Sequence, residues 1–277
     1  MNIIKNRDEG TSFWRAVGVF ILYVSIISST VAFVVFEVIK ALAHIQENTL
    51  PGLLLDQFKA VIAYTMAIIL MMKSFKAEGL EKLSIRGRTN INWIISILML
   101  FIGYYLFSHS TFGLLLEQIP IPKFIESSFN KIASNNYLMF FSLAITAPIF
   151  EEVISRGIIL ELFLKRYNDY VAIVLSAFIF GLIHMNIPQF INAFIIGLIL
   201  GYIYLRTSSL ALCILGHFVN NFIVAVMSII KPDYVSKFNL AQLIFGIIFI
   251  ALATYIIMEQ KNKEVYNKKI VNLEQGE

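Results

Sequence analysis

Eight apolar stretches dominate this sequence, and each approaches the length needed to cross a lipid bilayer. A spanning helix needs about 20 mainly apolar residues, because about 30 Å of hydrocarbon is crossed at about 1.5 Å per residue. Hydrophobic residues make up 58% of the chain and charged residues 14%, which is too little charge to cover a globule in water. The sequence therefore predicts an all-α integral membrane protein, a bundle of about eight transmembrane helices. The predicted spans are 13–39, 57–75, 91–108, 137–164, 169–187, 189–206, 208–230 and 239–258.

The short connection between the fifth and sixth stretches leaves the number of spans open. Only Met185–Pro188 separates them, so this pair could sink partly into the membrane and give seven or nine spans instead of eight. The first stretch is longer than the h-region of a signal peptide, which has about 7 to 15 residues, and we expect it to remain as an anchor.

Lysine and arginine are unevenly divided between the two alternating sets of connecting segments. Cytoplasmic loops of membrane proteins carry an excess of these residues, so the sequence predicts a multi-pass protein with both termini in the cytoplasm. Abundant isoleucine, lysine and asparagine favour the plasma membrane of a bacterium. The lysines and arginines that set the orientation also explain most of the net charge of +4. The basic charge therefore does not indicate nucleic-acid binding, and we expect no nucleic-acid partner. The richer set is Lys5, Arg7, Lys73, Lys76, Lys82, Arg86, Arg88, Lys165, Arg166, Arg206, Lys261, Lys263, Lys268 and Lys269, and the poorer set is Lys123, Lys131, Lys231 and Lys237.

Two long connections help to divide the chain. The stretch 76–91 carries leucine and isoleucine between basic residues, so it forms either an amphipathic helix on the inner leaflet or a solvated cytoplasmic loop. The stretch 109–136 contains two prolines, has a mildly amphipathic second half and lies outside. We divide the chain into a three-span region at 1–136, a central region at 137–230, and a last span with a cytoplasmic tail at 231–277.

Polar side chains cluster within three of the central spans. An ionised side chain at the bilayer centre costs at least about 2.5–3.5 kcal/mol, so such residues indicate function. The helical rise and the alternating span directions put them at similar depth, about 14–21 Å from the face where each helix enters. We therefore expect them to converge on one polar cavity. The residues are Glu151, Glu152 and Arg156 in the fourth span, His184 in the fifth, and His217, Asn220 and Asn221 in the seventh.

Helical spacing assigns partners within each span. Glu152 and Arg156 are four residues apart and share a face, where they can neutralise each other. Glu151 is rotated by about 100° from Glu152, which makes it the freer carboxylate and a candidate base. His217 and Asn221 are also four residues apart, and as two donors on one face they could hold an oxyanion.

At these residues the sequence resembles the CPBP family of intramembrane proteases, also called the CAAX amino-terminal protease or Abi family, which includes the Rce1-type prenyl-protein endopeptidases. The similarity covers about 137–230, a third of the chain, and each part lies in a separate apolar span. The three parts of the family pattern are Glu151-Glu152-x-x-x-Arg156, Phe180-x-x-x-His184 and His217-x-x-x-Asn221.

The resemblance implies a role for each residue. Glu151 with His184 would activate a water for attack on a peptide carbonyl, and His217 with Asn221 would stabilise the oxyanion that results. Glu152 and Arg156 would organise the site. The resemblance also makes 137–230 the catalytic core, carried by the fourth, fifth and seventh spans.

Metal dependence stays open at the level of sequence. Glu151, His184 and His217 could supply three zinc ligands and leave a position for water, yet the chain has no His-Glu-x-x-His helix. A cluster of cysteines is excluded, because Cys213 is the single cysteine. We favour a glutamate mechanism that requires no cofactor, with zinc as the alternative.

Three classes of function fit the sequence, and we give them from the most to the least favoured. The first is a membrane endopeptidase that cleaves a membrane-associated protein or peptide precursor, in peptide maturation or bacteriocin self-immunity. The second is a non-catalytic immunity or scaffold protein. The third is a proton-coupled transporter, which the lack of a detectable internal repeat disfavours.

Overall fold

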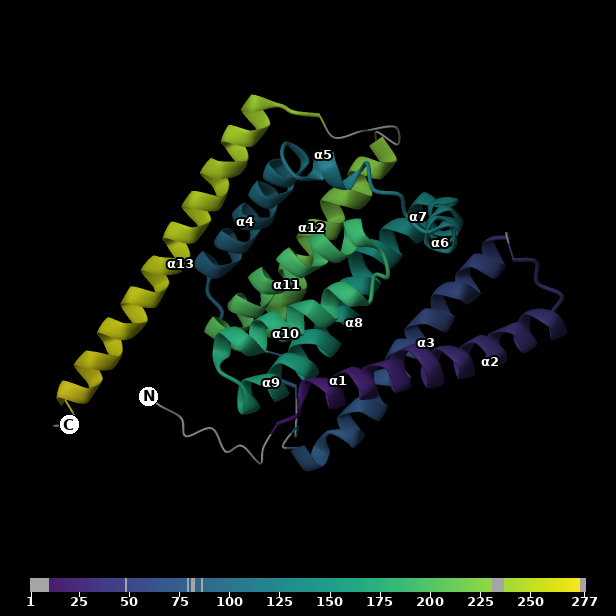
Figure 1. Ribbon diagram of the computed structural model, residues 1–277, viewed down its shortest axis with the longest axis horizontal. Coiled ribbons are helices and arrows are strands. Elements are labelled where there is room, and N and C mark those ends of the chain that lie inside the picture. The colour runs from purple at the N-terminus through teal and green to yellow at the C-terminus, as the bar shows by residue number, and fades with distance from the viewer. Residues whose placement is uncertain are drawn as a thin grey trace.

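The structure is a computed structural model in which the described residues form a bundle of helices (Figure 1). It describes residues 10–47, 49–78, 80, 83–85, 87–230 and 237–274, and beyond Gln260 the backbone alone. The helices before the central region are α1 (Phe13–Phe20), η1 (Ile21–Ser28), α2 (Ser29–Leu42), α3 (Leu50–Ser74), η2 (Lys76–Glu78), α4 (Ile91–His109), α5 (Gly113–Leu116) and α6 (Lys123–Ala133). The others are α7 (Asn136–Phe140), η3 (Phe141–Thr146), α8 (Ala147–Glu152), η4 (Val153–Leu160), α9 (Glu161–Arg166), α10 (Asp169–Leu182), α11 (Ile187–Thr207), α12 (Leu210–Ile230) and α13 (Leu240–Glu274).

Within the described residues, seven helices are long and apolar enough to cross a membrane, and they confirm an all-α integral membrane protein. Two of these spans run through several helical segments, from Phe13 to Leu42 and from Asn136 to Arg166. The fifth predicted span, 169–187, is not one of the seven. Its helix α10 stops at Leu182 after 14 residues, short of the about 20 that a crossing needs.

Local signals explain why α10 ends early and α11 begins where it does. The Asn186 side chain caps α11 by accepting from the Gln189 backbone N–H, and Pro188 occupies the first turn, where a missing N–H does no harm. Met185 has a positive φ of 53°, so the chain turns there sharply. The turn between α10 and α11 therefore comprises residues 183–186, and it carries His184.

The start of α1 and the C-terminal end of α13 lie toward the same end of the bundle (Figure 1). Backbone hydrogen bonds join residue 10 to Glu78, and Arg88 to Thr207. The Asn90 amide donates to Gln260 late in α13. This end, which we call the basic end, carries most residues of the richer lysine and arginine set, whereas α6 lies at the opposite end. Lys5, Arg7, Lys82, Arg86 and Lys231, and the start of the predicted 231–277 region, lie outside the described residues.

Of the two forms that the sequence suggested for the 76–91 connection, the described residues show a loop. After the short turn η2 its described residues contain no further helix. The Leu80 side chain is buried, and the carbonyl of Ser84 accepts from the backbone N–H of Leu210. The segment is therefore a loop that docks on the basic end of the bundle through Leu80 and Ser84, whereas Ile85 is 58% exposed.

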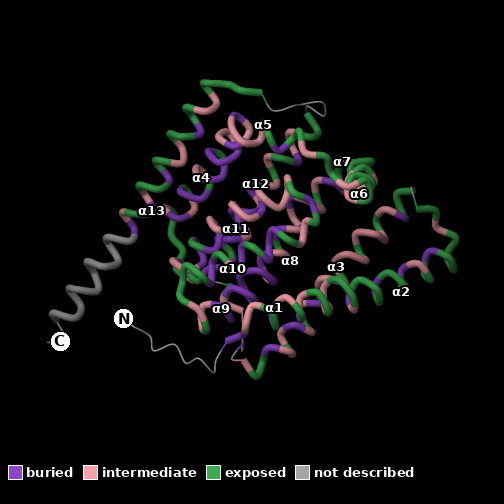
Figure 2. The backbone as a smooth tube through the Cα atoms, in the orientation of Figure 1, coloured by how far each residue is buried: buried purple, intermediate pink, exposed green. Residues whose placement is uncertain are grey.

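Burial separates a packed centre from a lipid-facing shell (Figure 2). Buried residues concentrate in α8 to α12, whereas α2, α3 and α13 expose large apolar side chains such as Phe33, Ile62 and Phe245. Inside a bilayer such exposure meets hydrocarbon. The centre, which the sequence assigns to the functional site, is thus the most tightly packed part of the molecule.

Gly197 allows α11 to approach α10 closely. A Cβ at this position would lie 2.8 Å from the Cβ of Ala177, which is closer than packed carbons come. We expect Gly197→Ala to lower the free energy of unfolding by about 1–3 kcal/mol through overpacking. Thermal unfolding of the purified protein in detergent measures this. Gly18→Ala is the matched control, since a Cβ there meets nothing within 4 Å, and equal effects of the two changes would refute the packing argument.

Candidate active site

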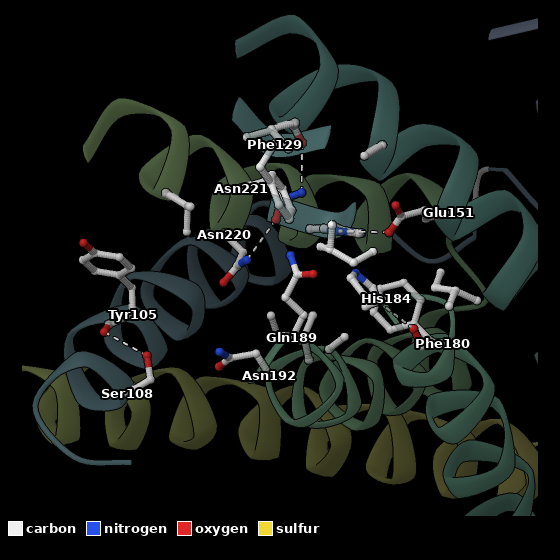
Figure 3. A pocket seen from close by; sticks show the side chains of 18 of the residues that line it. Tyr105, Ser108, Phe129, Glu151, Phe180, His184, Gln189, Asn192, Asn220 and Asn221 are labelled. Atoms are coloured by element: carbon white, nitrogen blue, oxygen red, sulfur yellow. Dashed lines mark hydrogen bonds and ion pairs between the residues drawn. The ribbon is translucent and has the colours of Figure 1, made fainter. Parts of the chain in front are cut away.

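The polar residues singled out by the sequence gather around one cavity of about 470 Å³ (Figure 3). Glu151 comes from α8, His184 from the α10–α11 turn, and His217 and Asn221 from α12, and all four line the cavity. Glu152 and Arg156 lie behind them, buried in the packed centre. The cavity lies toward the α6 end, where Phe129 of α6 forms part of its wall.

A buried network joins Glu152, the second glutamate, to Arg156 and His217. Arg156 donates from Nη1 to Glu152 Oε1 at 2.7 Å and from Nη2 to the carbonyl of Gly197 at 3.1 Å. His217 Nδ1 lies 2.8 Å from the same carboxylate oxygen. The guanidinium also lies over the ring of Phe180, 4.5 Å from its centre. Glu152 therefore binds Arg156, as its spacing predicts, and His217 as well, which the spacing could not show.

The contact with Glu152 orients the imidazole of His217. A carboxylate accepts hydrogen bonds, so the Nδ1 of His217 is the protonated donor and its Nε2 faces the cavity. This Nε2 lies 3.8 Å from Glu151 Oε2. That distance is too long for a hydrogen bond, and it leaves the Glu151 carboxylate available for a ligand in the cavity.

His184 is oriented in the same way by a backbone group. Its Nδ1 donates to the carbonyl of Phe180 at 3.1 Å, which leaves Nε2 as the nitrogen directed at the cavity. The ring of Phe180 lies edge-on between the two imidazoles, with centroids 5.6 Å from His184 and 5.6 Å from His217. One aromatic side chain thus sets the spacing of both histidines.

Asn221 is partly used within the protein. One N–H of its amide donates to the carbonyl of Leu143 at 2.9 Å, and its oxygen accepts from Asn220 at 3.0 Å. The second N–H is left for a ligand. His217 can donate to an oxyanion only when Nε2 is protonated, because its other nitrogen is bound to Glu152. His217 and Asn221 therefore both line the cavity. The Asn221 amide can donate one N–H to a ligand, and His217 can donate as well only when its Nε2 carries a proton.

The donor set does not fit a bound zinc ion as the side chains are placed. Both histidines have Nδ1–H bonded to an oxygen and Nε2 free, as zinc ligands do. However, in the part of the chain that the structure describes, no three histidine, cysteine, aspartate or glutamate side chains lie close enough to share a metal ion. We therefore route no step of the mechanism through a metal.

Several cavity residues escaped the sequence reasoning. They are neutral amides and hydroxyls, or a histidine near a helix end, and their signal in an apolar span is weaker than that of a charge. The available signal was the unfavourable burial of any polar group in lipid. These residues are Tyr104, His109, Gln189 and Asn192.

Comparison with known proteins shows what the site segment is similar to. Residues 133–223 match the family described as type II CAAX prenyl endopeptidase Rce1-like. This stretch contains all seven residues of the three-part pattern. The segment that carries the site is therefore similar to the Rce1-like family.

One curated relative supports the Rce1-like assignment. The chain is 28% identical over 115 residues to a protein of Bacillus subtilis (strain 168) named "Putative membrane peptidase YdiL". The alignment covers 41% of this chain and 47% of that protein, so the chain spans about half the length of the relative. No solved structure matches the chain.

Proposed function

We propose that the protein is an integral-membrane endopeptidase that hydrolyses a peptide bond with water activated by Glu151 and His184. The observation that carries this proposal is the convergence of one carboxylate and two imidazole Nε2 atoms on a single cavity. The Rce1-like match over 133–223 supports it.

The proposed reaction uses only side chains of this site. Glu151 takes a proton from a water that His184 orients through Nε2, and the water oxygen bonds to the substrate carbonyl carbon. The oxyanion formed accepts from the second N–H of Asn221 and from protonated His217. The C–N bond then breaks, and Glu151 gives its proton to the leaving amine. Glu152 and Arg156 hold His217 in place and do not touch the substrate.

The location of the cavity supports a membrane-associated substrate. Its walls combine the polar site with apolar side chains such as Ile183, Ala193 and Val224. It lies toward the α6 end, away from the basic end, so positive-inside topology places access on the outer side of a bacterial plasma membrane. We propose a membrane-associated peptide or protein precursor as substrate, in peptide maturation or bacteriocin self-immunity.

Cleavage by the reconstituted protein tests this proposal. Proteoliposomes are incubated with a library of N-palmitoylated peptides of varied sequence, and products are identified by mass spectrometry. We expect the wild type to cleave a subset, and Glu151→Ala, His184→Ala and His217→Ala to leave these peptides intact. Cleavage that survives all three changes would refute the mechanism, and biological activity without cleavage would favour a scaffold protein.

Removal of metal separates the glutamate mechanism from a zinc mechanism. We expect the purified protein to keep its full cleavage rate after exhaustive chelation, with metal content verified by mass spectrometry, because water activation is assigned to Glu151 and His184. Loss of activity on chelation, with full recovery on adding one equivalent of zinc, would overturn the metal-free assignment.

A further inference from the structure

Two neutral amides form a wall of the cavity that the proposed reaction does not use. Gln189 and Asn192 are three residues apart in the first turns of α11 and therefore lie on one face of the helix. Figure 3 shows both side chains beside the same space as Glu151 and His184. Amides inside a membrane protein are unfavourable unless they are hydrogen-bonded, so their partners indicate their purpose.

Neighbouring donors bind the oxygen atom of each amide. The hydroxyl of Tyr104 donates to Asn192 Oδ1 at 2.9 Å. Asn186 donates from Nδ2 to Gln189 Oε1, and its own position is fixed by a second bond to the carbonyl of His184. Among the described residues nothing accepts from the two amide nitrogens. The amide oxygens are therefore already bonded, and the NH₂ groups at Gln189 Nε2 and Asn192 Nδ2 remain able to donate to a ligand in the cavity.

Asn192 also lies where two cavities meet. A second cavity of about 530 Å³ extends under α5 and α6, and Ser108, His109 and Asn192 line both. A ligand long enough to pass from one cavity to the other must run past Asn192. A small molecule held at Glu151 would have no need of this continuation, whereas a chain molecule would.

We propose that Gln189 and Asn192 bind two main-chain carbonyl oxygens of a peptide that lies extended through both cavities. This rests on the proposed peptidase function. Positions three apart on a helix have Cβ atoms about 5–6 Å apart. Carbonyls two residues apart on one side of an extended chain repeat at about 6.7 Å, which the flexible amides can match. Because both donors are neutral and recognise the backbone, the enzyme selects extended, unfolded segments and tolerates varied side chains at these positions.

Replacing each amide tests the proposal through substrate affinity. The probe is the best-cleaved N-palmitoylated peptide of the library. We expect Gln189→Ala and Asn192→Ala each to raise its KM about 5- to 10-fold, the effect of one neutral hydrogen bond, with kcat changed less than about 2-fold. Tyr104→Phe should raise KM less, because the Asn192 amide remains but loses its orientation. Asn90→Ala is the control, since it removes an amide bonded to Gln260 at the basic end and should leave KM unchanged.

Substrates with one ester in place of an amide locate the two hydrogen bonds. An ester carbonyl is a weaker acceptor, so an ester scan along the peptide should reveal two sensitive positions, two residues apart. In Asn192→Ala one position should become insensitive, and in Gln189→Ala the other. Binding of the same fluorescently labelled peptides to the Glu151→Gln protein repeats the scan without turnover.

The outcomes separate this proposal from the peptidase function. Cleavage by the wild type with unchanged KM in both alanine variants, or with no ester-sensitive pair, would overturn the role of Gln189 and Asn192 alone. Binding with the predicted ester pattern but no cleavage would refute the peptidase function and keep the extended-peptide site. The absence of both binding and cleavage would overturn both.

Discussion

Glu151→Gln is expected to slow cleavage of the best N-palmitoylated peptide by about 100- to 10,000-fold, the range that a general base contributes. Glutamine has the size of glutamate but cannot take a proton from water. Glu151 lies at the cavity surface, 3.8 Å from the nearest histidine nitrogen, and is not part of the buried Glu152 network. We therefore expect thermal unfolding of this variant to match the wild type.

Single-turnover cleavage in proteoliposomes measures this effect without interference from product release. The matched control is Glu161→Gln, the same change in α9, where the carboxylate accepts from the Tyr204 hydroxyl and does not line the cavity. The control should cleave at the wild-type rate. A Glu151→Gln rate within about 3-fold of the wild type, far inside the range above, would eliminate Glu151 as the base.

One physical reason made two features predictable from the sequence. These are the positions of most membrane helices and the charged residues that lie within them. Lipid penalises polar groups, so long apolar runs identify helices, and the few charges within them stand out. The predicted span 91–108 became Ile91–His109, and 208–230 became Leu210–Ile230. Glu152 and Arg156 pair as their four-residue spacing indicated.

Other features of the site could not be predicted from the sequence, because they depend on contacts between segments that are far apart in the chain. His217 binds Glu152 across 65 positions of the chain, and no local period reveals such a pair. The fifth predicted span, 169–187, was too long because the mainly apolar run was extended past Ile183, whereas the asparagine cap and the positive φ of Met185 break the helix. As a result His184 lies on a turn directly after α10, where its Nδ1–H reaches the Phe180 carbonyl.

The donors on α11 were missed for a related reason. An asparagine or glutamine in an apolar span is common enough as a link between helices that its sequence signal is weak. Its role depends on which end of the amide is already bonded. That is set by Tyr104 on α4 and by Asn186 in the α10–α11 turn, and so by the tertiary structure.

Glu152→Gln is expected to lower the free energy of unfolding by about 3–5 kcal/mol, the effect of removing one partner of a buried ion pair. Arg156 is fully buried and its Nη1 binds Glu152 at 2.7 Å, so the change leaves an uncompensated charge in the packed centre. Thermal unfolding in detergent measures the loss. Glu161→Gln is again the matched control, because its partner Tyr204 is neutral, and it should lose about 1 kcal/mol. Unfolding of Glu152→Gln at the wild-type temperature would contradict the ion-pair assignment.

A double variant separates the two roles of Glu152. Glu152→Gln combined with Arg156→Met removes both charges, and it should recover much of the lost stability, because a neutral pair needs no compensation. It should not recover cleavage, since Glu152 is a positioning residue that also holds Nδ1 of His217. Recovery of both stability and wild-type cleavage would mean that Glu152 serves the fold alone and that His217 is oriented by other contacts, such as the ring of Phe180.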